Sequence, residues 1–439
     1  MIAEHLKILY VSPMPPSPPL GGAQARMHGL MTNLARRHDI TAICLIDEDG
    51  DVEECRRAMR SYCRDVILVP NPNGRAGLAK RMLQLRSIAS RRSYEHHRFR
   101  VPALQEELDR RLQHERFDVV NLEFTYLGGL RLRPSSAGMP APPLVLGTHE
   151  IAYDIVRQVA RGGASAGRRL YAALNWRKLR RDEHAAFRAA DGISACSAAD
   201  QARVLAHVPA ARTVVIPNAA DVDFYQPRPS DPPPDGRTVV FFGLLSTFPN
   251  IDGVLFFLRE IWPRVAAERP AARCRIIGAR PPAPVRQLAG PRVEIAGFVE
   301  DLRPHLAAAA VLVVPLRVGG GTRLKIVEGM AMGRPIVSTT LGAEGIEAVH
   351  DRSILIADEP ATFAGSVIRL LDDPVLAARL GRSARELAVE RYSWPAAARR
   401  LEQFLGEIIA SPRSPYRAAH HTEEADPAET AGAETGGSV

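Results

Sequence analysis

Short apolar runs, each followed by a turn and then a helical pattern, recur along the whole chain of 439 residues. This alternation is typical of parallel βαβ units, because a strand covered on both faces reads as an apolar run and its crossover requires a helix. In the first half the runs are Lys7–Ser12, Ile40–Ile46, Asp65–Val69, Asp118–Leu122, Pro143–Gly147 and Gly192–Ala195. In the second half they are Thr238–Phe242, Arg273–Ile277, Arg292–Ala296, Val311–Pro315, Pro335–Ser338 and Ser353–Ile356. The length suits two α/β domains of ordinary size, each a Rossmann-like doubly wound sheet.

A proline-rich segment separates the two sets of runs. Gln226–Arg237 reads QPRPSDPPPDGR, and this density of proline prevents regular structure. We therefore place a first domain at 1–210, a crossover and linker at 211–237, and a second domain at 238–392. An amphipathic helix is predicted at 393–411. The polar residues 412–439 have no apolar period and are predicted to form a disordered tail.

Composition limits the class of protein and its compartment. Apolar residues make up 46% and charged residues 24%, as in soluble globular proteins. The five cysteines are odd in number and contain no C-x-x-C pair, so we expect reduced thiols, with Cys44 and Cys274 packed inside strands. The start of the chain does not resemble a signal peptide, and no segment approaches the length of a transmembrane helix. These features favour a cytoplasmic protein that at most touches a membrane.

The net charge of +8 is concentrated in two stretches of the first half. Arg75–Arg100 carries eight Lys/Arg and one acid, and Ile155–Arg181 carries eight Lys/Arg and none. Within the first stretch, Leu78–Arg92 (LAKRMLQLRSIASRR) mixes apolar residues with five cations, a composition that favours an anionic membrane surface. The alternative is an ordinary solvated helix face.

The segment from Val311 to Gly333, VLVVPLRVGGGTRLKIVEGMAMG, has the strongest functional pattern. A strand is predicted to end at Pro315 and a helix to run from Thr322 to Gly333. Three glycines lie between them: Gly319, Gly320 and Gly321. Glycines allow a phosphate to approach the backbone, and a helix N-terminus offers free N–H groups.

Two cations stand where helix electrostatics alone does not favour them. Arg323 and Lys325 fall in the predicted first turn, near the positive end of the helix dipole. A bound anion would explain them. The alternative is a glycine-rich turn with a surface pair between Lys325 and Glu328.

This segment resembles the donor-site signature of family-four GT-B glycosyltransferases, in which two glutamates separated by seven residues surround a sugar nucleotide. The resemblance implies two facing Rossmann-like domains, with Glu328 holding the ribose hydroxyls. It assigns donor binding to Gly319, Gly320, Gly321, Thr322, Arg323, Lys325, Glu328, Gly243 and Asn218. The position of the first glutamate holds Gly320, so donor-sugar recognition departs from the family pattern.

Segments of the first half extend the resemblance. Gly21 and Gly22 follow the first strand and look like the family's loop that faces the cleft; the alternative is a tight turn with a proline-rich lead-in. His149 and Glu150 follow Pro143–Gly147, where the family often carries a cleft histidine near the reacting sugar; the alternative is a structural histidine.

The crossover and the end of the chain resemble the family as well. Residues 190–197 and 216–221 are similar to its crossover, with Ser197 and Asn218 lining the cleft, although Asn218 could equally be a turn former. Residues 391–394, RYSW, resemble the closing segment after which the last helix crosses back to the first domain.

A second departure concerns the donor's phosphates. After Thr238–Phe242 the family commonly has an arginine that follows a glycine and a lysine five residues later, whereas here Leu244 follows Gly243 and Pro249 takes the lysine position. We hypothesise that Arg323 and Lys325 supply the missing charge.

The resemblance implies transfer of a sugar from a nucleoside diphosphate to a hydroxyl of a glycan or lipid-linked acceptor, with retention of configuration. His149 or Glu150 is expected to assist. The predicted donor loops have no Asp-x-Asp element and the chain has no His/Cys cluster with ligand spacing, so no metal or other cofactor is expected.

Other functions are considered. A nucleotide-sugar epimerase on this fold and a catalytically silent, nucleotide-binding partner of another transferase remain alternatives. A dinucleotide-dependent oxidoreductase is disfavoured because no strand is followed by G-x-G-x-x-G, and a nucleic-acid binder because no reading module is recognisable.

Overall fold

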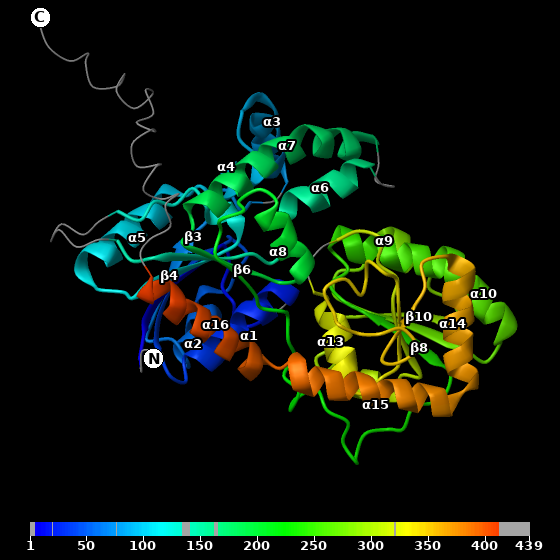
Figure 1. Cartoon of the computed structure of the whole chain (residues 1–439). Coiled ribbons are helices and arrows are strands. Elements are labelled where there is room, and N and C mark those ends of the chain that lie inside the picture. The colour runs from blue at the N-terminus through cyan, green and yellow to red at the C-terminus, as the bar shows by residue number, and fades with distance from the viewer. Residues whose placement is uncertain are drawn as a thin grey trace, which may run out of the picture.

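The computed structural model describes residues 5–19, 21–75, 77–133, 141–161, 166–319 and 322–411. In this part of the chain two parallel sheets form two lobes, and helices cover each sheet (Figure 1). The predicted tail, 412–439, lies outside the described residues.

The N-terminal sheet contains β1 Lys7–Ser12, β2 Asp39–Ile46, β3 Asp65–Pro70, β4 Val119–Glu123, β5 Leu144–Gly147, β6 Gly192–Ala195 and β7 Thr213–Val215. The C-terminal sheet contains β8 Thr238–Phe242, β9 Arg273–Ile277, β10 Val293–Gly297, β11 Val311–Val314, β12 Ile336–Ser338 and β13 Leu355–Ile356. Each apolar run of the sequence thus contains a strand, as predicted. β7 was missed, because it has only three half-buried residues, and it pairs with β6 inside the range assigned to the crossover.

The N-terminal helices are α1 Gly22–Leu34, α2 Val52–Arg60, α3 Leu78–Ala89, α4 Tyr94–Phe99, α5 Pro102–His114, η1 Thr125–Leu127, α6 Ala152–Arg161, α7 Ala166–Ala189 and α8 Ala198–Leu205. The C-terminal helices are α9 Phe248–Phe256, η2 Phe257–Ile261, α10 Trp262–Glu268, α11 Ala283–Arg286, α12 Arg303–Ala308, α13 Leu324–Ala331, α14 Pro360–Asp372, α15 Pro374–Arg391 and α16 Trp394–Ala410.

Strand order places the loops that can bind a ligand. In the described residues the orders are β3-β2-β1-β4-β5-β6-β7 and β10-β9-β8-β11-β12-β13, with parallel pairing throughout. The order reverses between β1 and β4 and between β8 and β11. Ligands of such sheets bind beyond the carboxyl ends of the strands at this reversal. Two potential sites therefore exist, one in each lobe.

Apolar side chains pack on both faces of each sheet. Cys44 and Cys274 are buried in β2 and β9, as predicted from their apolar surroundings. The last helix, α16, packs on α1 of the N-terminal lobe (Figure 1). Trp394 and Phe404 of α16 belong to the same buried cluster as the β1 side chains.

The chain crosses between the lobes twice, and the crossings are joined. The Ala220 N–H donates to the Tyr392 carbonyl over 2.8 Å, and Ala220 forms a parallel bridge with Ser393. The segment from 226 to 237 contains neither helix nor strand, in keeping with its prolines.

Close contact between α1 and α16 depends on Gly29. A Cβ atom at Gly29 would lie 2.3 Å from Cδ2 of Trp394, whereas a Cβ atom at Gly406 of α16 would meet no atom within 4 Å. We expect Gly29→Ala to lower the free energy of unfolding by about 1–3 kcal/mol through overpacking. The matched control Gly406→Ala should leave stability unchanged or raise it by up to about 1 kcal/mol. Thermal denaturation distinguishes the two, and equal melting temperatures would contradict this account.

Candidate donor and acceptor site between the lobes

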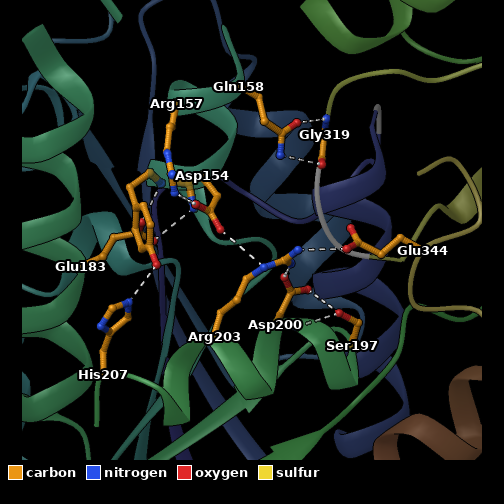
Figure 2. Close-up of polar contacts among 12 residues, drawn as sticks. Asp154, Arg157, Gln158, Glu183, Ser197, Asp200, Arg203, His207, Gly319 and Glu344 are labelled. Carbon is orange, nitrogen blue, oxygen red and sulfur yellow. Dashed lines mark hydrogen bonds and ion pairs between the residues drawn. The ribbon is translucent and has the colours of Figure 1, made fainter. Parts of the chain in front are cut away.

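The loop after β11 reaches the N-terminal lobe. The Gly319 N–H donates to Oε1 of Gln158 on α6 over 3.0 Å, and Gln158 Nε2 lies 3.5 Å from the Gly319 carbonyl oxygen (Figure 2). Two further glycines of the predicted donor loop, Gly320 and Gly321, lie outside the described residues. The Thr322 hydroxyl donates to the Cys196 carbonyl, at the end of β6, over 2.7 Å. This loop is therefore fastened to the N-terminal lobe at both described ends.

Helix α13 begins later than the sequence indicated. It starts at Leu324 rather than at Thr322, and Arg323 is its extended N-cap residue, with φ −83° and ψ 109°. The Thr322 side chain is bonded to Cys196, so it does not cap the helix. The guanidinium of Arg323 consequently lies beside the loop, and a Cβ atom at Gly319 would be 3.0 Å from Nη2.

Lys325 extends from α13 to the carboxyl end of β8. Its Nζ donates to Asn250 Oδ1 over 2.7 Å and lies 4.1 Å from the centre of the Phe241 ring. Gly243, with φ +148°, makes room for it, because a Cβ atom there would be 2.8 Å from Nζ. Lys325 therefore occupies the neighbourhood in which the family pattern led us to expect two other cations.

The surface-pair alternative for Lys325 does not describe the structure. Lys325 bonds Asn250, and among the described residues it forms no ion pair with Glu328. Burial lowers the pKa of Lys325 to about 7; the charge of Arg323 adds to this and that of Glu328 opposes it. Burial also raises the pKa of Glu328 to about 7, against the opposing influence of Lys325 and the Tyr225 hydroxyl. Both residues are half-buried.

Glu150 and His149 lie on the N-terminal side of this boundary. Burial raises the pKa of Glu150 to about 7, while the charge of Arg323 from the other lobe opposes the rise. His149 Nε2 lies 2.7 Å from Glu123 Oε2, and its ring stacks on Phe124 with centroids 3.9 Å apart. Burial lowers the pKa of His149. Both residues follow β5 and lie where parallel strands present functional groups.

The first glycine loop also faces the C-terminal lobe. A Cβ atom at Gly21 would lie 4.0 Å from Leu244, and one at Gly22 would lie 3.3 Å from Leu324. The small residues thus let the start of α1 approach the loops after β8 and β11.

Asn218 and Ser197 join or cap elements. Asn218 accepts from Arg26 Nη1 over 3.0 Å and donates to the Thr322 carbonyl over 2.5 Å, so it holds the start of α13 rather than merely turning the chain. Ser197 caps α8 by accepting from the Asp200 N–H over 3.1 Å. The side chains of Asn218 and Ser197, which were predicted to line the cleft, are thus both hydrogen-bonded within the described structure.

Several residues at the boundary were not found by sequence reasoning. Arg203 of α8 forms ion pairs with Asp154, Asp200 and Glu344 at 3.4, 2.9 and 2.9 Å, and Glu344 belongs to the C-terminal lobe (Figure 2). Gln158, Asn250 and Arg26 carry no motif. The sequence does contain a signal for Glu123. It directly follows the run Asp118–Leu122, and polar residues at the ends of parallel strands gather at one edge of the sheet.

Within the described ranges, no helix is both long and apolar enough to span a bilayer. The five cysteines are free.

The sequence matches two family descriptions. Residues 20–224 match "Glycosyltransferase Family 4" and residues 236–373 match "Glycosyl transferases group 1". A GDP-mannose-dependent monoacylated alpha-(1-6)-phosphatidylinositol monomannoside mannosyltransferase of Corynebacterium glutamicum is 30% identical over 162 residues, 34% of this chain and 42% of that protein. The MMP alpha-(1->4)-mannosyltransferase of Mycolicibacterium hassiacum is 29% identical over 196 residues, 42% of this chain. The chain spans less than half the length of these curated relatives, 42% and 46%.

Solved structures share the whole architecture. Sucrose-phosphate synthase of Thermosynechococcus elongatus superposes with a TM-score of 0.70 at 17% identity, covering 93% of this chain and 100% of that chain. HepE of Anabaena, in complex with UDP and glucose, gives 0.63 at 17% identity, covering 91% and 99%. At such identities the likeness establishes the fold. With the two family matches and the two doubly wound sheets, it shows that the chain belongs to the group 1, family-four glycosyltransferases of the GT-B fold.

Proposed function

We propose that this chain transfers a sugar from a nucleoside diphosphate to an acceptor hydroxyl, with retention of configuration. The observation that carries the proposal is the placement of Arg323 beside Gly319 and of Lys325 at the carboxyl end of β8. Glu328 follows on the same helix, α13, within electrostatic range of Lys325, and Glu150 of the other lobe lies within electrostatic range of Arg323. A diphosphate supplies the opposite charge that compensates these half-buried cations, and a carboxylate suits the vicinal hydroxyls of ribose.

The named ligands of similar proteins support the donor class. HepE is described in complex with UDP and, separately, with UDP-glucose, and the Corynebacterium relative is named as GDP-mannose-dependent. A nucleoside-diphosphate sugar is the chemistry that these ligands share. For this chain we propose that donor class, without a particular base or sugar.

The charges suit the developing transition state. As the bond between the anomeric carbon and the diphosphate oxygen breaks, negative charge grows on the diphosphate beside Arg323 and Lys325. The acceptor oxygen forms the new bond on the same face, and its proton passes to the departing diphosphate. We propose that these two cations neutralise the negative charge on the departing diphosphate without a metal ion.

The Gln158 contact fits an exchange of partners at Gly319. A neutral amide oxygen now accepts from the Gly319 N–H over 3.0 Å. A phosphate oxygen makes the stronger, charge-assisted bond to such a donor. Donor binding is therefore proposed to displace Gln158 from the loop.

We propose a lipid-linked or cell-surface glycan as the acceptor, with the N-terminal lobe resting on an anionic membrane. Apolar side chains are exposed on one face of α3 and on neighbouring α7: Leu78, Met82, Leu85, Ile88, Leu170 and Leu174. The two helices are joined by Ser87 and Tyr171, whose hydroxyl oxygens are 2.8 Å apart. Exposed Lys80, Arg81 and Arg86 accompany this face, the combination expected of an interfacial helix.

Turnover of a donor panel tests the reaction. With purified protein, we expect release of nucleoside diphosphate only when a nucleotide sugar and a polyprenyl-linked or glycan acceptor are both present, and unchanged rates with EDTA. Conversion of the donor sugar without acceptor would indicate the epimerase alternative. Weak binding with no diphosphate released would indicate the silent partner.

Removing either cation tests the donor site. Arg323→Ala and Lys325→Ala should each weaken nucleotide-sugar affinity about 10- to 100-fold, because a hydrogen bond to a charged group contributes roughly 1.5–3 kcal/mol. Isothermal titration calorimetry measures this. Arg264→Ala, on the exposed surface of α10, removes one charge from the same lobe and should bind like the wild type. Wild-type affinity in both site variants would refute the assignment of charge.

Vesicle sedimentation tests the membrane face. Leu85→Asp should reduce partitioning onto phosphatidylglycerol vesicles roughly tenfold or more, since it removes an inserted apolar side chain and adds like charge. Val375→Asp is the control, because Val375 is 76% exposed on α15, outside this face. Binding should weaken with salt. Equal binding of both variants, or none at low ionic strength, would contradict the proposed orientation.

A further inference from the structure

A buried carboxylate lies at the point where the strand order of the N-terminal sheet reverses, and it is not one of the residues of the proposed donor site. Glu123, at the end of β4, is 2% exposed. Its Oε1 accepts from the Tyr10 hydroxyl over 2.6 Å and from Asn121 Nδ2 over 2.8 Å. Both neighbours of this oxygen are therefore donors.

The other oxygen of Glu123 faces His149. Oε2 lies 2.7 Å from His149 Nε2. Although burial opposes it, the hydrogen bonds from His149 and Tyr10 lower the pKa of Glu123. An ionised carboxylate can only accept, so Nε2 must carry the proton. A Cβ atom at Gly147 would be 2.5 Å from Oε2, so the glycine makes this approach possible.

The second ring nitrogen of His149 is left with a lone pair. Burial lowers the pKa of His149, which favours the neutral ring, and a neutral ring with its proton on Nε2 has an acceptor at Nδ1. Among the described residues His149 makes no hydrogen bond other than that to Glu123. Stacking on Phe124, with planes inclined by 12°, fixes the ring plane.

We propose that Glu123 is a positioning residue that holds His149 as its Nε2-protonated tautomer, so that Nδ1 accepts a hydrogen bond from a substrate hydroxyl. The part concerning substrate rests on the proposed glycosyl transfer. The part concerning the tautomer is a property of the free protein, so the two can fail separately.

Glu123→Gln reverses the polarity of the pair without changing its shape. Tyr10 and Asn121 both donate to the Oε1 position, so the glutamine oxygen is retained there. Its NH₂ group then faces His149 and donates to Nε2. The imidazole proton must move to Nδ1, which becomes a donor where an acceptor is required.

The chain offers a matched control in a second carboxylate–histidine pair. His38 Nε2 lies 3.1 Å from Glu402 Oε1, but His38 Nδ1 accepts from the Leu6 N–H over 3.2 Å. The backbone thus fixes the tautomer of His38 without Glu402. Glu402→Gln should change neither the tautomer of His38 nor the rate of transfer.

Long-range ¹H–¹⁵N spectra of histidine-labelled protein read the tautomer directly, with the His149 signals assigned by their loss in His149→Gln. We expect the wild type to carry the proton on Nε2 and Glu123→Gln to carry it on Nδ1. The transfer rate of Glu123→Gln should fall about 10- to 100-fold, the effect of leaving a buried polar group without its partner. Among deoxy analogues of donor and acceptor, one should abolish the difference between wild type and variant.

Each possible result supports or overturns a stated part of the proposal. A wild-type proton on Nδ1, or an unchanged tautomer in Glu123→Gln, would overturn the positioning role. A switched tautomer with a wild-type rate would overturn the role of Nδ1 toward substrate. If no nucleotide sugar binds to the wild type, the proposed function fails, and the spectra still decide the tautomer.

Discussion

The half-buried ammonium group of Lys325, held among neutral partners, is the constraint on which the character of this site depends. Its nearest partners, the Asn250 amide oxygen and the Phe241 ring, are neutral. Within the described residues no carboxylate lies at ion-pair distance from Nζ. Removing an ammonium ion from water costs several kcal/mol unless an opposite charge compensates, which is why its pKa falls to about 7. The proposed diphosphate would supply the opposite charge that the described neighbours of Lys325 lack, whereas a neutral ligand would leave this cost uncompensated.

The strands could be predicted because the apolar pattern that marks each one lies within its own few residues. A strand covered on both faces by helices must be apolar along its length, and β1, β8 and β9 have the bounds that the sequence indicated. β7 has three half-buried residues and gives no such signal. The start of α13 was placed two residues early, because the sequence does not reveal that the Thr322 hydroxyl bonds Cys196, over a hundred positions away.

The candidate site was predicted in its parts but not in its connections. The glycines and cations of the loop formed a pattern, and the family resemblance assigned them a role. The partner of Lys325 depends on Asn250, which comes from a different segment and belongs to no motif. Likewise, the end of the run Asp118–Leu122 marked Glu123 only as a polar residue at a strand end, and its partners Tyr10 and His149 are found only when β1, β4 and β5 lie side by side. Side-chain partners across strands are set by tertiary packing, and a single sequence does not display it.

The position of α16 has a consequence for how the chain folds during synthesis. Trp394, Leu401, Phe404 and Leu405 of α16 complete an apolar cluster whose members outside α16 come mostly from the first lobe. That lobe leaves the ribosome first, yet one of its faces stays open to water until residues near position 400 have emerged. The second lobe has no such dependence, since its sheet and helices are contiguous in sequence. The C-terminal lobe can thus reach its native packing before the N-terminal lobe, although it is synthesised later. A chain that terminates before α16 exposes an apolar surface that chaperones and proteases can recognise.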